Sequence, residues 1–179
     1  MDAIECMLTR RSVRKFTEDP LPQEDLDKIL EAVRYSPSWE NTQCWELVVV
    51  RDAGQKQKLQ EAVPGNNPAR KGLLQAPVVI ALCARLGRAG GKPEAPMSEY
   101  GDWFMFDAGI AAQNLCLAAW ALGYGTVNVG WLDHQAGAKV LGLPDDVKLL
   151  ELIPVGRPAK EPKTPKRREF SDFVHNERF

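Results

Sequence analysis

The sequence predicts a protein of mixed α and β structure, folded as a single domain over residues 1–179. Three observations support this fold class. Apolar residues recur at helical spacing after Pro22, and apolar runs of strand length occur at 45–50, 77–84 and 148–155. The length of 179 residues, with 44% hydrophobic and 26% charged residues, suits one domain with its own core.

The first elements follow from apolar spacing and turn-forming residues. A short helix is expected over 4–9 and a turn over 17–20. Pro22 is placed to be the first residue of a second helix, which ends before Pro37. The apolar positions of this helix are Leu26, Ile29, Leu30 and Val33.

The segment 36–43 joins this helix to the first strand, and it is rich in polar and turn-forming residues. Ser38, Asn41 and Gln43 could hydrogen-bond to a planar heterocycle, because loops that enter strands often carry sites. They could equally serve only to cap and turn the backbone. Composition leaves both interpretations open.

A short amphipathic helix is expected over 53–62, and the apolar run 77–84 reads as a buried strand. Residues 85–100 are rich in Gly, Pro and charge, so a mobile loop or lid is expected there. Trp103 and Phe104 at its end could wall a substrate pocket or form the first turn of a core helix.

The helix expected over 102–122 is the most apolar segment of the chain. Apolar residues cover most of its circumference, which is typical of a buried helix. Its small residues, which allow another backbone to come close, are Ala108, Gly109, Ala111 and Ala112. Burial against a partner subunit as well as against its own sheet predicts a dimer.

The stretch 122–131 is prone to β structure and is bracketed by glycines. Gly130 lacks a side chain where a flat ligand could lie against the backbone, although a plain turn explains it equally well. Asp133 is expected to cap a helix that runs to Leu141. The tail 160–168, taken by itself, is a solvated basic segment.

Composition argues against several classes of function. The net charge of −1 and the pI near 6.2 disfavour a general nucleic-acid-binding domain. Four widely spaced cysteines with only two histidines predict buried, reduced thiols and no metal site. No signal peptide is recognised and no apolar run reaches the ~20 residues of a membrane span, so a cytoplasmic location without a membrane partner is expected.

The strongest local signal is the segment Arg10–Phe16, where three arginines, a lysine and a serine occur within seven residues. The residues Arg10, Arg11, Ser12 and Arg14 offer guanidinium forks and a hydroxyl group, which suit a phosphate dianion. Clustered basic residues also form solvated faces and nucleic-acid patches, so the heptapeptide alone does not decide between these readings.

Five motifs, in one order over nearly the whole chain, resemble those of the FMN-dependent nitroreductase family. They are Arg10–Phe16, Ser36–Trp45, Asp107–Leu115, Leu122–Gly130 and Pro165–Arg168. The resemblance implies an α+β fold with a mixed β-sheet flanked by helices, in an obligate homodimer with the long central helix at its interface. It also implies bound FMN, NADH or NADPH as electron donor, and ping-pong hydride transfer to nitroaromatic, quinone or related small acceptors.

The same resemblance implies a set of site residues drawn from both subunits. Those expected to contact FMN are Arg10, Arg11, Ser12, Arg14, Pro37, Ser38, Asn41, Gln43, Asn67, Val129, Gly130, Lys166 and Arg168. The first four and the two tail residues would hold the phosphate and ribityl chain, and the loop 37–41 would come from the other subunit. The Gly130 N–H would face flavin N5 as the group closest to catalysis. Trp39, Trp103 and Phe104 would line the acceptor pocket.

Two departures from the family pattern affect the expected function. Cys44 stands where proline is common, and Trp39 and Glu40 replace smaller residues in the flavin loop. If Trp39 blocks the nicotinamide, the chain would be a flavin- or nucleotide-binding protein without NAD(P)H-driven turnover. A cysteine-nucleophile enzyme is a third hypothesis, which lacks a histidine in a recognisable nucleophile setting.

Overall fold

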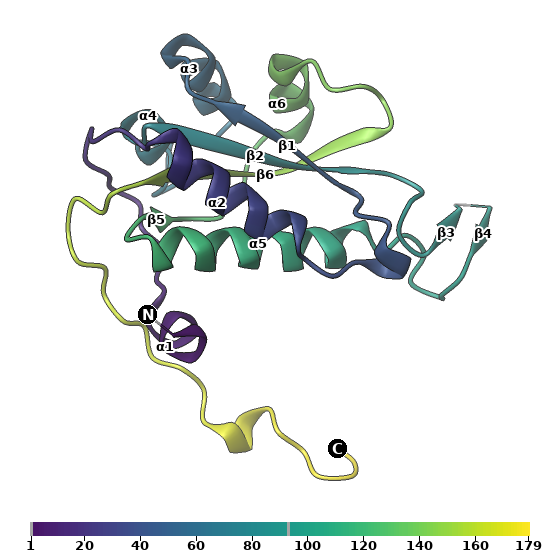
Figure 1. Ribbon diagram of the computed structural model, residues 1–179. Helices are drawn as coiled ribbons and strands as arrows, with labels where there is room; N and C mark the ends of the chain where they lie inside the picture. The colour runs from purple at the N-terminus through teal and green to yellow at the C-terminus, as the bar shows by residue number, and fades with distance from the viewer. Residues whose placement is uncertain (1, 93) are drawn as a thin grey trace.

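A computed structural model of the chain describes residues 2–92 and 94–179. Its centre is a four-stranded sheet in the order β1-β2-β6-β5 (Figure 1). The strands are β1 (Trp45–Val50), β2 (Val78–Arg85), β6 (Val147–Gly156) and β5 (Gly125–Thr126). On one face lie α2 (Gln23–Arg34) and α5 (Phe104–Ala121), and on the other lie α3 (Ala53–Glu61), α4 (Gly72–Gln75) and α6 (His134–Leu141). The predicted α+β fold class is confirmed.

The three predicted strands are present. The strand at 45–50 has the expected bounds. The other two differ from the expected 77–84 and 148–155 by one residue at each end. β2 is buried along nearly its whole length, because helices cover both faces of this central strand. This explains why its sequence is a continuous apolar run rather than an alternating one.

The sheet is antiparallel rather than mixed. β1 with β2, β2 with β6 and β6 with β5 are all antiparallel pairs. Within the described residues, Ser12 forms an isolated parallel bridge with Thr126 of β5. That bridge attaches the basic segment to the edge of the sheet.

The predicted helices are present with small shifts at their ends. Pro22 is the N-cap of α2 and not its first residue, so the helix begins at Gln23. Asp133 caps α6 as expected, because its carboxylate accepts a hydrogen bond from the Ala136 N–H at 2.9 Å. The helix α4 was not predicted, since four residues are too few to show an apolar period.

The expectation of a structureless loop over 85–100 is wrong in part. The short strands β3 (Gly91–Lys92) and β4 (Ala95–Pro96) pair antiparallel there, and Pro93 between them lies outside the described residues. Hydrogen bonds fix the base of the segment, from Trp103 N–H to the Ala89 carbonyl and from Gly87 N–H to the Asp102 carboxylate. Positive φ angles at three of its glycines explain the glycine-rich composition.

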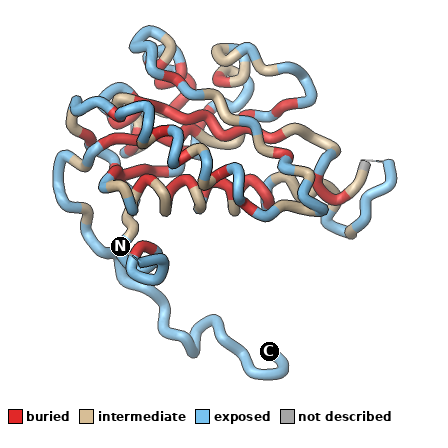
Figure 2. Tube along the Cα trace, in the orientation of Figure 1, coloured by how far each residue is buried: buried red, intermediate tan, exposed pale blue. Residues whose placement is uncertain are grey.

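The helix α5 is buried on one side only. Ala108, Ala111, Ala112, Leu115 and Cys116 pack in the cluster between the helix and the sheet. The other side is open, and exposed residues there include Met105, Phe106, Gly109 and Gln113, so buried and exposed positions alternate along the helix (Figure 2). The single chain therefore leaves one side of this apolar helix uncovered.

Both ends of the chain carry exposed apolar residues. In α1 (Ala3–Thr9) the side chains of Ile4, Met7 and Leu8 are more than half exposed. After Pro158 the chain leaves the body of the molecule as an almost entirely exposed tail with one short turn of helix, η2 (Phe170–Asp172) (Figures 1 and 2). None of the helices in the described chain combines the length and the hydropathy that a membrane crossing requires.

Candidate functional site

The basic segment follows α1 and is held in place by two buried apolar side chains. Val13 and Phe16 pack with Ala76, and the Val13 N–H donates to the Thr126 carbonyl at 2.8 Å. Val13 and Phe16 point inward. Ser12, which precedes Val13, and Arg14, which follows it, therefore lie at the surface. The segment is therefore a rigidly attached edge of the sheet that presents its polar residues to solvent.

The arginines of this segment differ in whether their guanidinium groups have hydrogen-bond partners. Arg11 donates to the carbonyls of Leu8 and Arg10 and so closes the end of α1. The guanidinium groups of Arg10 and Arg14, by contrast, have no hydrogen-bond or ion-pair partner among residues 2–92 and 94–179. Two guanidinium groups thus remain available for an anion.

Two cavities adjoin these arginines. One of about 490 Å³ is lined by Arg10, Arg11, Ser12, Arg14, Lys163, Thr164, Pro165 and Arg167. The other, of about 520 Å³, is lined by Ser12, Val13, Arg14, Lys15, Pro68, Lys160, Glu161, Pro162 and Lys163. Only Glu161 is acidic among these residues, so both cavities have a strongly positive lining.

The tail meets the basic segment, but not through the two expected residues. Arg167 and Lys163 line the cavities, whereas Lys166 and Arg168 do not. Arg168 donates to the Asp172 carbonyl and lies over the Phe173 ring, with 5.6 Å from its guanidinium carbon to the ring centroid. In the single chain the Arg168 guanidinium group therefore contacts other residues of the tail and not the basic segment.

Gly130 has open space on the side where a side chain would lie, and its neighbour Trp131 contacts Asn67. A Cβ atom added to Gly130 would meet no atom within 4 Å. Its backbone N–H makes no hydrogen bond within the described parts of the chain, although its neighbour Val129 is paired with Leu152. The Asn67 amide donates to the Trp131 carbonyl at 3.3 Å. The structure therefore places Asn67 next to the segment that contains Val129 and Gly130.

The loop before β1 is strained and tightly self-bonded. Glu40, Asn41 and Gln43 all have φ angles between 46° and 57°, a region that non-glycine residues rarely adopt. The Ser38 hydroxyl accepts from the Gln43 N–H at 2.9 Å, and the Gln43 amide donates to Asn41. Such strain persists only where surrounding contacts hold it, and it is enriched at functional sites.

Asp107 of α5 provides one of these contacts. Its buried carboxylate accepts from the Trp39 N–H at 3.0 and 3.2 Å. The short helix η1 (Trp39–Asn41) that follows is thereby fixed to the first turn of α5. Within the described residues, the Trp39 indole N–H and the Thr42 hydroxyl are buried without a hydrogen-bond partner.

The aromatic residues near this loop separate into two groups. The Trp39 and Trp103 rings lie 5.3 Å apart, and Phe106 packs edge-on against Trp103 at 5.1 Å. Pro37, Ser38, Asp107 and Ile110 complete a cavity of about 240 Å³ with these three rings. Sequence reasoning missed Phe106, although its spacing of three residues from Trp103 on one helix could have suggested the pair.

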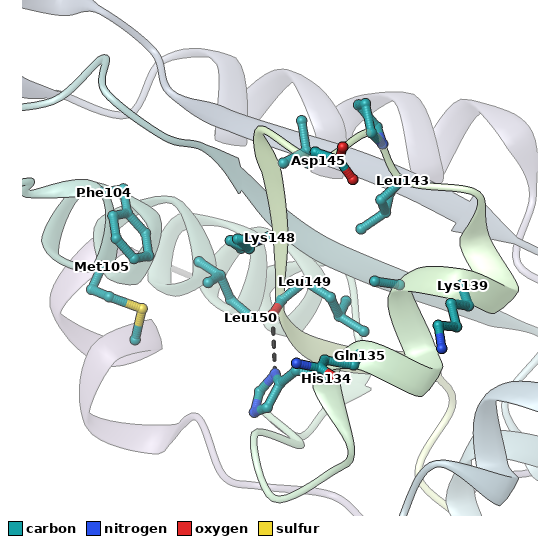
Figure 3. Close-up of a pocket in the computed structure, with 13 residues that line it drawn as sticks. Phe104, Met105, His134, Gln135, Lys139, Leu143, Asp145, Lys148, Leu149 and Leu150 are labelled. Carbon is teal, nitrogen blue, oxygen red and sulfur yellow. Dashed lines mark hydrogen bonds between the residues drawn. The ribbon is translucent and has the colours of Figure 1, made fainter. Parts of the chain in front are cut away.

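Phe104, which was predicted to share that pocket, lies elsewhere. It lines a different cavity of about 590 Å³ with Met105, residues of α6 and the first half of β6 (Figure 3). There His134 Nδ1 lies 3.0 Å from the Leu149 carbonyl oxygen. Phe104 and Phe106 are two residues apart in α5, which places them about 200° apart around the helix axis, so their side chains point to different sides.

The two parts of the predicted flavin site lie at opposite ends of α5. The Trp39 loop is bonded to Asp107, whereas α1 is bonded further along, through the Cys6 thiol to the Leu117 carbonyl. Ten residues of helix separate these attachments, which corresponds to about 15 Å along the axis. In the single chain, Pro37, Ser38 and Asn41 therefore lie toward the other end of α5 from Arg10 and Arg14.

The four cysteines are free and buried, as predicted. Burial raises the pKa of Cys44 to about 12, with a smaller contribution from the charge of Asp107. Burial also raises the pKa of Cys83 to about 12, and it raises those of Cys6 and Cys116. Thiols with raised pKa values are poor nucleophiles near neutral pH, so this environment does not favour cysteine chemistry.

Comparison with known proteins agrees with this geometry. The chain matches the model of the nitroreductase family over residues 7–72 and 65–157. It is 32% identical to the FMN reductase [NAD(P)H] of Bacillus subtilis over 183 residues, covering 92% of this chain and 70% of that protein. It is 28% identical to the NADPH-flavin oxidoreductase of Vibrio harveyi over 180 residues, covering 99% and 75%.

Solved structures give the same result. The hypothetical oxidoreductase YcnD of Bacillus subtilis superimposes with a TM-score of 0.87 at 31% identity, covering all of this chain and 75% of that one. The match extends over the sheet, α5 and the segments that carry the candidate site. The chain therefore belongs to the nitroreductase family.

Proposed function

We propose that this chain, an FMN-dependent NAD(P)H oxidoreductase, works as a homodimer that passes hydride by a ping-pong mechanism to nitroaromatic, quinone or related small acceptors. Relatives named FMN reductase and NADPH-flavin oxidoreductase support the cofactor and the electron donors. The acceptor class and the shared sites rest on the geometry described above.

One observation carries the proposal of shared sites. The basic segment and the Trp39 loop lie about 15 Å apart along α5, at its two ends. Two α5 helices that pack against each other in opposite directions bring the loop of one subunit to the basic segment of its partner. The exposed apolar residues of α5 and α1 are the surface that such packing would cover.

The residues present fit FMN. Arg10 and Arg14 are unpaired guanidinium groups beside a positively lined cavity, which suits a phosphate dianion. At the other end of the site, the open surface over Gly130 has room for a flat ring, and its unpaired N–H is a donor for a ring nitrogen. We assign Asn67 to the pyrimidine edge and Val129 to the ring face.

When bound, FMN supplies the hydride chemistry, and the chain supplies binding, orientation and tuning. The arginines hold the phosphate, and Gly130 orients the ring through its backbone. The aromatic group of Trp39, Trp103 and Phe106 has an apolar surface on which a planar acceptor stacks. No side chain is required as a nucleophile, which agrees with four buried thiols.

The first prediction concerns the visible spectrum of the purified protein. Flavin absorption bands are expected, and they are expected to bleach when NADH or NADPH is added without oxygen. Bands that persist with both donors would instead favour the flavin-binding protein without turnover. A colourless protein that does not take up added FMN would contradict the proposed cofactor.

The second prediction concerns phosphate binding by Arg14. Arg14→Ala removes a charge-assisted contact worth about 1.5 to 3 kcal/mol, so the Kd for FMN should rise roughly 10- to 150-fold. Titration of FMN fluorescence measures this change. Lys58→Ala, an exposed cation of α3, is the matched control and should leave the Kd unchanged. Equal Kd values for the two variants would exclude Arg14 from the phosphate site.

The third prediction concerns the exposed side of α5. Gly109→Lys adds a side chain to open space in the single chain, so the fold should tolerate it. In a dimer packed through α5 the same side chain would separate the helices. Analytical ultracentrifugation at micromolar concentration should therefore find wild-type dimer and Gly109→Lys monomer.

Gln57→Lys, at an exposed position of α3, is the control for added charge on a helix and should remain dimeric. The Gly109→Lys protein should also retain little FMN, because each site would lose residues from the partner subunit. A wild-type monomer, or a dimeric Gly109→Lys protein with full FMN content, would contradict the proposed interface.

The fourth prediction concerns thiol reactivity. A thiol reagent such as DTNB at pH 7.5 should label fewer than one cysteine in the native protein, because burial raises all four pKa values. The same reagent should label all four after unfolding in urea, which provides the internal control. Rapid labelling of Cys44 in the native state would return the cysteine-nucleophile hypothesis to consideration.

A further inference from the structure

The pairing of Val129 with Leu152 sets the position of Glu151 relative to Gly130. Val129 and Leu152 exchange both backbone hydrogen bonds, at 3.0 and 3.1 Å, as an antiparallel pair. Continuing this pairing by one residue places Gly130 opposite Glu151. In an ideal antiparallel ladder the Cα atoms of such a pair lie about 4.5 Å apart.

The side chain of Glu151 is on the α5 face of the sheet. Its partner on β2 is Leu82, which packs in the cluster beneath α5 together with Ile153. Leu152 and Val129 belong to the cluster on the opposite face. A bulge at Leu150 sets this orientation, because Leu82 pairs with Glu151 while Cys83 pairs with Leu149.

The polar groups around Glu151 form a small cluster below α5. The Cys116 thiol donates to the Asn128 amide oxygen at 3.3 Å, and Asn128 lies two residues before Gly130 on the same face. The pKa of Cys116 is raised mainly by burial and, to a smaller degree, by the negative charge of Glu151. Glu151 and Cys116 therefore share the α5 side of the sheet, on which an added Gly130 Cβ would meet no atom within 4 Å.

The Glu151 carboxyl group is half-buried and unpaired. Within 2–92 and 94–179 it makes no hydrogen bond and no ion pair. Burial alone raises its pKa to about 7. Other titratable or charged groups facing this region are Cys116 of α5, the Arg10 side chain, which lowers the Cys116 pKa, and the exposed Lys148 of β6.

We propose that Glu151 is a further residue of the flavin site, placed across from Gly130 to hold the proton that accompanies hydride transfer. This rests on the function proposed above. Hydride from NAD(P)H brings two electrons and one proton into the site and raises its negative charge. The Glu151 carboxylate then takes one proton from water onto an Oε atom.

The proton leaves Glu151 when the acceptor is reduced. A quinone that receives the hydride and this second proton becomes a quinol, and the carboxylate is ready for the next cycle. The balance is one hydride from the donor and one proton from water for each two-electron acceptor. Glu151 is a positioning and proton-holding residue here, and Gly130 remains the group that contacts the ring.

The test compares wild type with Glu151→Gln, which keeps the shape and removes the titration. The reduction potential of bound FMN should be measured at several pH values between 5 and 9. Because wild type binds one additional proton on reduction, its potential should fall more steeply with pH around and above pH 7 than that of the variant. Glu61→Gln, an exposed glutamate of α3, should keep the wild-type slope, and Glu151→Asp should restore much of it.

A second readout needs no cofactor. The folded-state pKa of Glu151, about 7, lies above the ordinary value of 4.5, so the folded protein binds more protons than the unfolded chain between these pH values. Its contribution to the Tm of the FMN-free protein should therefore decline as pH rises from about 4.5 to 7. Glu151→Gln should lack that component, whereas Glu61→Gln should retain it.

The outcomes separate the two proposals. FMN uptake with equal slopes of potential against pH in wild type and Glu151→Gln would overturn the role of Glu151 and leave the proposed function intact. Failure of wild type to bind FMN would overturn both. A loss of slope in Glu151→Gln with wild-type FMN affinity, together with the Tm change, is the result expected from a proton-holding group.

Discussion

The molecule is organised by the burial of α5, a helix too apolar for a single chain to cover. One side packs against the sheet through Ala108, Ala112 and Leu115, and the opposite side remains open at Met105 and Phe106. Because burial of apolar surface contributes ~25 cal/mol per Å², covering this open face would stabilise the dimer proposed above. The same helix also fixes the functional segments, because each of its ends is bonded to one of them. The packing of α5 and the geometry of the candidate site are therefore linked in this fold.

Each functional segment takes its conformation from a polar contact with a buried element. The basic segment is tied to the sheet through Val13 and Thr126, and the Trp39 loop is tied to the Asp107 carboxylate. Asn67 is tied to the carbonyl of Trp131 beside Gly130. None of these segments is regular enough to hold its own shape, and three residues of the Trp39 loop have strained φ angles. The rigid core thus stabilises conformations that the site needs and the local sequence disfavours.

Apolar periodicity predicted the strands and helices because burial itself produces the pattern. It did not predict α4 or the β3–β4 hairpin, which are too short to show a period. The candidate residues at Asn67, Val129 and Gly130 were found from the family resemblance, and the structure places Asn67 next to the segment that contains the other two. The sequence could not tell that Arg11 closes α1 or that Phe104 points into another cavity. Those outcomes depend on the direction of a side chain, which spacing along one element does not determine.

The distribution of charge along the site follows from its two tasks. At the phosphate end Arg14 is exposed and Arg10 is partly exposed, so their positive charges cost little solvation before a ligand arrives. At the ring end Asn67, Val129 and Gly130 carry no charge, whereas the half-buried carboxyl of Glu151 lowers stability wherever it is ionised. An apolar side chain facing Leu82 would pack better there. A carboxyl group at this position therefore opposes the stability of the fold, and such opposition is characteristic of residues that serve a reaction rather than the core.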